Sequence, residues 1–157
     1  MRVMTDRSAE APAPPASVNR RKRRAYDCLA DALRFQLEAC REAEGLATIV
    51  VSDQLGFCVA HSGGDGDHAE LAARLPILAN QTGGADVARS HEGTGLPWMA
   101  GSLVVRSFSV DEDTLYVGAI AGHGVELGVG NGDGDDVGPG GAILDRVASG
   151  FARLLAQ

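Results

Sequence analysis

The chain has 157 residues, 45% of them hydrophobic and 22% charged, with a mean hydropathy of −0.03. This composition is typical of one globular domain with tails, and it disfavours two full domains, a disordered chain or a fibrous one. No apolar run reaches the ~18 residues of a bilayer span, and the N-terminus has no apolar stretch typical of a secretory signal. We therefore expect a cytoplasmic protein without a membrane span.

Charge is distributed unevenly along the chain. Residues 1–24 carry seven basic and two acidic side chains, whereas the whole chain has a formal net charge of −7. The acidic remainder and an aromatic content of 4% disfavour specific nucleic-acid binding by the folded part. Lys22 is the only lysine, so the chain lacks the lysine-containing loop of P-loop nucleotide-binding proteins.

The N-terminal segment 1–24 is predicted to be a disordered tail, because Pro12, Pro14 and Pro15 interrupt a stretch without apolar periodicity. A basic run ends this segment, and cations there would oppose the positive end of a helix dipole. The run is therefore predicted to project from the first helix or to stay unfolded. It would then be free to contact an acidic partner, nucleic acid or anionic lipid through Arg20, Arg21, Lys22, Arg23 and Arg24.

Two helices with one apolar face are predicted in the first half of the domain. The first starts near Tyr26 and stops at Gly45, with apolar residues at helical spacing between them. The second begins at Asp67, whose spacing to Glu70 is that of a capping box, and ends near Gln81. Pro76 lies inside this second helix and is expected to kink it or make it restart. Its apolar face carries Leu71, Leu75 and Leu78.

Two antiparallel hairpins are predicted from runs rich in β-branched residues. The first joins Leu46–Ser52 to Phe57–Ser62, and the second joins Leu103–Val110 to Leu115–Ala121. A short fifth strand is expected at Val125–Val129. The Gly-rich segment 83–100 has no clear assignment, 130–141 is predicted to be a flexible loop, and a final amphipathic helix follows it.

The order helix, hairpin, helix, hairpin, helix predicts an α+β fold with a single antiparallel sheet of four or five strands. The first and last helices are expected on one face of this sheet and the second helix on the other. The folded domain is predicted to span residues 25–157.

Candidate catalytic and metal-binding residues are few. His61 and His68, with Asp65 and Asp67, could ligate a metal, but a solvated loop with a helix cap is the favoured interpretation. His123 follows a strand without an identifiable nucleophile or acid partner. The three cysteines are expected to be buried packing residues rather than nucleophiles: Cys28, Cys40 and Cys58. No catalytic residue, cofactor or resident metal is predicted.

Three segments resemble the roadblock/dynein light chain family over roughly residues 25–157. The stretch 47–60 is similar to that family's apolar strand, Ser-Asp-x-x-Gly turn and second strand of small residues. The stretch 115–122 resembles a later strand. The helix 146–155 resembles the Gly-containing terminal helix of bacterial members.

This resemblance implies a non-catalytic module that forms a homodimer or a roadblock-type heterodimer and that serves a small Ras-like GTPase as scaffold, activator or exchange platform. In that family the second helix and the central strand commonly build the dimer. The corresponding interface candidates here are Glu70, Leu71, Arg74, Leu75, Leu78, Leu103 and Val105. For the leucines, packing inside one chain is an equally good interpretation.

Two other functions stay open from the sequence. One is a small-molecule sensory domain of the PAS or GAF type, which would also have an antiparallel α/β architecture. The other is a metal-assisted enzyme that uses His61, His68 or His123.

Overall fold

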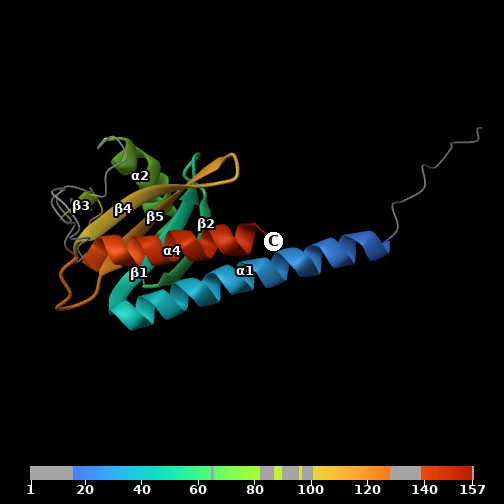
Figure 1. Ribbon diagram of the computed structural model, residues 1–157, viewed down its shortest axis with the longest axis horizontal. Helices are drawn as coiled ribbons and strands as arrows, with labels where there is room; N and C mark the ends of the chain where they lie inside the picture. Colours follow the sequence, from blue (N-terminus) through green and yellow to red (C-terminus); the bar gives the residue numbers. More distant parts are fainter. Residues whose placement is uncertain are drawn as a thin grey trace, which may run out of the picture.

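The computed structural model describes residues 16–64, 66–81, 87–89, 96, 101–127 and 139–156; the side chains of residues 16–26, 87–89 and 139 lie outside this description. Helices and strands follow one another as α1 (Ala16–Glu44), β1 (Leu46–Asp53), β2 (Cys58–Gly63), α2 (His68–Asn80), β3 (Val87–Arg89), β4 (Leu103–Val110), β5 (Asp113–Ala121) and α4 (Pro139–Leu155) (Figure 1). The fold is α+β with a single antiparallel sheet, as the sequence predicts.

The sheet has five strands in the order β2-β1-β5-β4-β3. The two predicted hairpins form four of these strands, and β1 pairs with β5 antiparallel to join them, with Val50 opposite Gly118. The remaining strand, β3, pairs with β4. Most residues of β1 and β5 are apolar and buried. A strand that is covered on both faces needs such a continuous apolar run.

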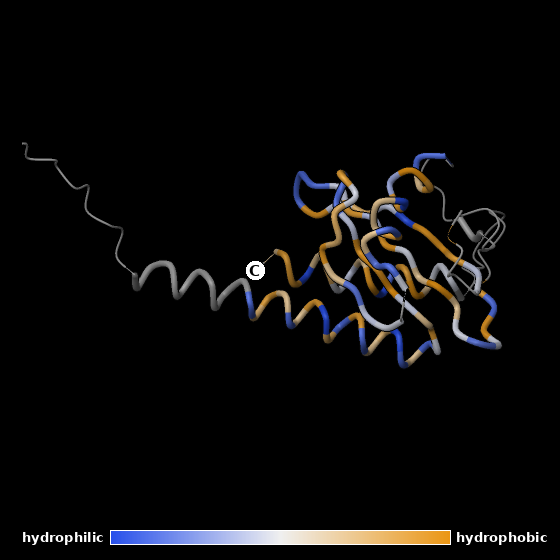
Figure 2. Tube along the Cα trace, turned by 180° about the vertical axis from the view of Figure 1, so that it is seen from behind, coloured by the Kyte–Doolittle hydropathy of each residue, from blue (hydrophilic) through white to orange (hydrophobic). Residues whose placement is uncertain are grey.

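Helices cover both faces of the sheet (Figure 1). One face packs against α1 and α4 in a core that includes Leu37, Leu144 and Phe151. The other face packs against α2 in a second core that includes Leu71 and Leu75. Figure 2 shows apolar stretches along the strands and alternating polar and apolar residues along the outer helix α1. The predicted placement of the three helices is therefore confirmed.

Three expectations about element boundaries need correction. The first helix starts at Ala16 rather than near Tyr26, so the basic run 20–24 lies on helical backbone; alanine, lysine and arginine are good helix formers. The fifth strand is β3, inside the Gly-rich segment 83–100, whereas residues 125–127 form no strand. The last helix starts at Pro139, inside the predicted loop 130–141, because proline suits the first turn of a helix.

Other parts of these expectations fall outside the described residues. They are the tail 1–15, residues 128–129 of the expected strand and most of the loop 130–141.

The second helix is continuous through the buried Pro76 and does not restart there. Within the described ranges, none of the helices combines the length and apolar composition needed to cross a bilayer.

The prediction of buried cysteines is correct for Cys40 only. Cys40 lies on the inner side of α1, and burial raises the pKa of its thiol. Cys28 and Cys58 are exposed, because they lie on the outward side of α1 and on the outermost strand β2.

Candidate functional site

The start of α2 is fixed by the predicted cap. Asp67 has extended backbone dihedrals, and its Oδ1 accepts a hydrogen bond from the amide of Glu70 at 2.9 Å. This bond satisfies one of the amides left unpaired at a helix N-terminus. The cap thus fixes the residue at which α2 begins.

Five of the seven predicted interface residues lie inside the chain. Leu71, Leu75, Leu103 and Val105 are completely buried, and Leu78 is 4% exposed. They form the core between α2 and the sheet. In this conformation none of them is available at the surface of one chain, so they hold α2 in place.

Two glycines let α2 lie close to the sheet. A Cβ on Gly118 of β5 would lie 2.5 Å from Cδ2 of Leu75. A Cβ on Gly56, in the turn between β1 and β2, would lie 2.9 Å from the Cα of Ala73. Gly56 also has a φ of 84°, which favours glycine. The turn and the central strand are therefore shaped around α2.

The outer side of α2 carries the remaining predicted residues and one that the sequence analysis missed. Glu70 is half-buried and Arg74 is exposed. Ile77, one turn after Arg74, is 55% exposed. The sequence could have indicated Ile77, because it lies in the apolar run 75–79 but on the side of the helix opposite the leucines. Glu70, Arg74 and Ile77 are the outer α2 face named below.

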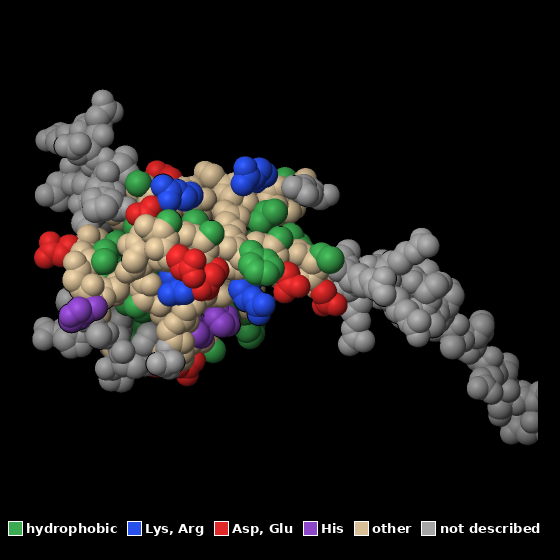
Figure 3. Space-filling model, turned by 90° about the horizontal axis from the view of Figure 1, so that it is seen from below, with side chains coloured by type: hydrophobic (Ala, Val, Ile, Leu, Met, Phe, Trp, Pro, Cys, Tyr) green, Lys and Arg blue, Asp and Glu red, His purple; other side chains and the backbone are tan. Residues whose placement is uncertain are grey.

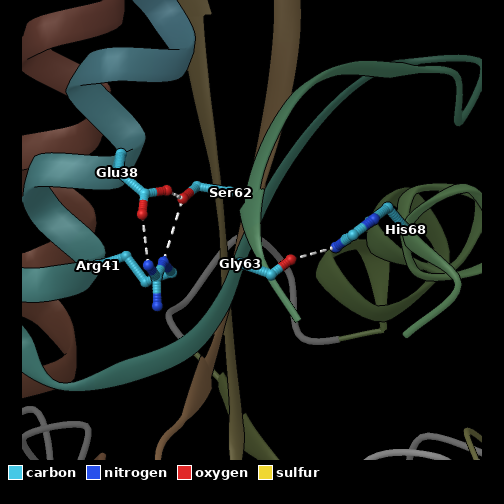
Figure 4. A network of polar contacts seen from close by, with 5 residues as sticks. All are labelled: Glu38, Arg41, Ser62, Gly63 and His68. Atoms are coloured by element: carbon cyan, nitrogen blue, oxygen red, sulfur yellow. Dashed lines mark hydrogen bonds and ion pairs between the residues drawn. The ribbon is translucent and has the colours of Figure 1, made fainter. Parts of the chain in front are cut away.

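A second group of polar residues joins α1 to β2 (Figure 4). Arg41 donates from Nε to Oγ of Ser62 at 3.1 Å, and it also pairs with Glu38. Ser62 Oγ donates to the other carboxylate oxygen of Glu38. The hydrogen bonds from Arg41 and Ser62 lower the pKa of Glu38, and the bond to Glu38 raises the pKa of Arg41.

The histidine pair lies beside this network. The rings of His61 and His68 stack with their centroids 4.0 Å apart. Nε2 of His68 lies 2.7 Å from the carbonyl oxygen of Gly63, so this nitrogen carries the proton. Burial, and then the neighbouring His68 and Arg34, lower the pKa of His61. Side chains of both charges and histidines gather on this face in the view from below (Figure 3).

The stacked rings do not make a metal centre in the described residues. No group of three or more His, Cys, Asp and Glu side chains converges there. Asp65 of the predicted loop cluster is outside the described residues, and Asp67 is the α2 cap. His123 is exposed in the segment after β5.

The basic run 20–24 lies on the N-terminal part of α1. Only its backbone belongs to the described part of the chain, so contacts of its side chains are not assigned. This part of α1 extends past the C-terminal end of α4 (Figure 1).

Comparisons with known proteins support the fold. No family model matches the chain, and no curated protein matches it. Among solved structures, the gliding protein MglB from Thermus thermophilus matches with a TM-score of 0.52 and 15% identity, over 80% of this chain and 90% of that one. Myxococcus xanthus MglB gives 0.48 and 9%, over 80% and 89%. An MglB with a tetrameric arrangement gives 0.49 and 16%, over 80% and 89%. The chain has the roadblock/longin-like fold.

Proposed function

We propose that this chain is a non-catalytic regulatory module that forms a dimer through the outer α2 face and binds a small Ras-like GTPase. The proposal takes its function class from the resemblance to the roadblock family. The fold shared with the Thermus thermophilus gliding protein MglB supports it.

The single observation that carries the dimer is the exposed Ile77 beside Arg74. An isoleucine that is 55% exposed on the outer side of α2 leaves apolar area in contact with water. A second copy of the same face would cover it, because two-fold dimers bring identical patches together. The leucines beneath keep α2 rigidly on the sheet, so the face is pre-organised for association.

The edge of the sheet adds a second contact to this proposal. Val87–Arg89 is the last strand in the strand order, and a terminal strand presents one side of its backbone for pairing with another chain. Leu103 and Val105 belong to the neighbouring strand β4. Within the chain they pair with β3, Leu103 with Arg89 and Val105 with Val87. Their proposed part in the dimer is therefore to hold β3 in place for pairing with a second copy.

The test of the dimer is the solution mass of the full chain by size-exclusion chromatography with light scattering. Ile77→Asp with Arg74→Glu is expected to convert a dimer to a monomer, because two desolvated like charges would face each other. Both positions are exposed, so the circular dichroism spectrum should not change. Phe35→Asp, at a site 69% exposed on α1, is the matched control and should leave the mass unaltered.

The partner is tested separately with purified small Ras-like GTPases, loaded with GDP or with a non-hydrolysable GTP analogue. Binding is measured by titration calorimetry, and the GTP hydrolysis rate is measured with and without this chain. Binding that depends on the nucleotide supports the proposal. If the chain is a dimer but binds none of the GTPases, the proposed GTPase partner is contradicted. If the wild-type chain is a monomer, the proposed dimer is contradicted.

A further inference from the structure

A groove lies at the end of the sheet where both hairpins turn. Its volume is about 420 Å³, and it opens between the two turns and the last residues of α4. The residues that line it are Asp53, Gln54, Leu55, Val59, Val110, Asp111, Asp113, Thr114, Leu115 and Leu155. This hairpin groove has three carboxylates and no basic side chain in its lining.

The hairpin groove is apolar as well as acidic. Leu55 is 76% exposed in the turn, and Val59 is 40% exposed on β2. Phe57, between them in the sequence, is also exposed. Three of the five large apolar side chains that are exposed in the described part of the chain thus lie within residues 55–59. Such clustering marks an interaction surface more than scattered exposure does.

The N-terminal part of α1 projects at this same end of the molecule. Gly150 of α4 lies against Gln36 of α1, and α4 ends beside the groove with Leu155. From there α1 continues toward its N-terminus past the end of α4, away from the domain (Figure 1). The part before Leu29 is about 20 Å long at the usual rise per residue. It contains the basic run.

The charges of this projecting part are unfavourable to its own helix. Within the run, Arg20 and Arg24 have the i, i+4 spacing at which like charges repel. The first turn of α1 has no acidic residue to favour the helix dipole. An acidic, apolar surface would offset each of these costs.

We propose that the projecting part of α1 of one copy docks in the hairpin groove of a second copy, with the basic run against Asp53, Asp111 and Asp113. The second copy is required because α1 is one continuous helix that leaves its own domain at this end. The groove and the projection lie at the same end, so two copies can exchange them reciprocally. This contact is separate from the outer α2 face.

The experiment is a charge exchange in the full chain, followed by sedimentation velocity at micromolar concentration. One variant reverses the run with Arg20→Glu, Arg21→Glu, Arg23→Glu and Arg24→Glu. The other makes the groove less acidic with Asp113→Lys, at the first residue of β5, and with Glu112→Lys beside it; both positions are exposed. Each variant alone is expected to lose the largest species that the wild type forms. An equimolar mixture should regain it, because the unchanged basic run of the groove variant then meets the unchanged acidic groove of the run variant.

The control variant carries Glu42→Lys and Glu126→Lys. It has the same change in charge as the groove variant, at exposed positions that do not line the groove, and it should sediment as the wild type does. The largest wild-type species should also shrink in about 1 M salt, where the Debye length falls to about 3 Å.

The proposal is overturned if both reversed variants sediment as the wild type does, or if the mixture does not regain the lost species. A dimer that survives both reversals but is lost in Ile77→Asp with Arg74→Glu leaves the α2 dimer intact and overturns this contact alone. If salt changes the sedimentation coefficient while the mass stays constant, the groove binds a segment of the same chain. That result would overturn the proposal that a second copy occupies the groove.

Discussion

Gly118 at the centre of the sheet and Leu75 of α2 are in direct contact, and a Cβ on the glycine would lie 2.5 Å from Cδ2 of the leucine. Gly118 pairs with Val50 on one side and with Val105 on the other, so its backbone is held by two strands. Leu75 is completely buried and cannot move aside into solvent. The missing side chain of Gly118 therefore lets α2 approach the centre of the sheet this closely.

Gly118→Ala is expected to destabilise the chain by about 1–3 kcal/mol, the usual cost of overpacking a close-packed core. Urea unfolding monitored by circular dichroism measures this change. Leu75→Ala supplies the room that the new methyl group needs, although alone it leaves a cavity. The double variant should then lose less stability than the sum of the two single variants. If the stability loss of the double variant equals the sum of the two single losses, the contact between Gly118 and Leu75 is contradicted.

Ser52 and Ser62 lie on neighbouring strands, are both buried, and differ in their partners. Oγ of Ser52 has no hydrogen-bond partner among the described residues, whereas Oγ of Ser62 bonds to Glu38 and Arg41. A buried hydroxyl without a partner costs stability. Ser52→Ala is therefore expected to raise the free energy of unfolding by about 1 kcal/mol or less.

Ser62→Ala serves as the matched comparison, because it removes the same atom from a strand of the same sheet. It should lower the melting temperature, since it deprives Glu38 and Arg41 of a shared partner. Differential scanning calorimetry of both variants measures the two changes. A loss of stability in Ser52→Ala that equals the loss in Ser62→Ala would show that Ser52 has a partner after all.

The hairpins, the α2 cap and the distribution of helices over the sheet were predictable because each depends on local chemistry. Runs rich in β-branched residues predict the strands, and the Asp67 and Glu70 spacing predicts the cap. β3 was not predictable, because Val87–Arg89 has only three residues and depends on pairing with β4. The extension of α1 to Ala16 was missed because its residues have no apolar period.

The candidate interface shows a different limit of sequence patterns. The spacing of Leu71, Leu75 and Leu78 predicts one apolar face of a helix, and the structure confirms that they share a buried face. A periodic pattern does not distinguish a sheet of the same chain from a second chain as the surface that buries it. Ile77 lies off this buried face of α2, and Leu55 lies in the turn between β1 and β2; these exposed apolar residues belong to the two proposed surfaces.

Glu38 should make the stability of the chain depend on pH. Hydrogen bonds from Arg41 and Ser62 lower its pKa below the ordinary value of 4.5. A group whose pKa is depressed by folding stabilises the folded state above its unfolded pKa, and this contribution disappears as the pH falls through the lower folded pKa. Wild type should therefore exceed Glu38→Gln in stability near neutral pH, and the difference should shrink below about pH 4.5.

Urea unfolding of both proteins between about pH 3 and pH 7 measures this difference, and taking the difference removes the titration of the other carboxyl groups. Glu42→Gln, at an exposed position on the same helix outside the network, is the control and should run parallel to wild type. Ser62→Ala should reduce the pH-dependent difference, because it removes one of the two bonds that lower the pKa of Glu38. A difference between wild type and Glu38→Gln that stays constant over the whole range would mean that this network does not form in solution.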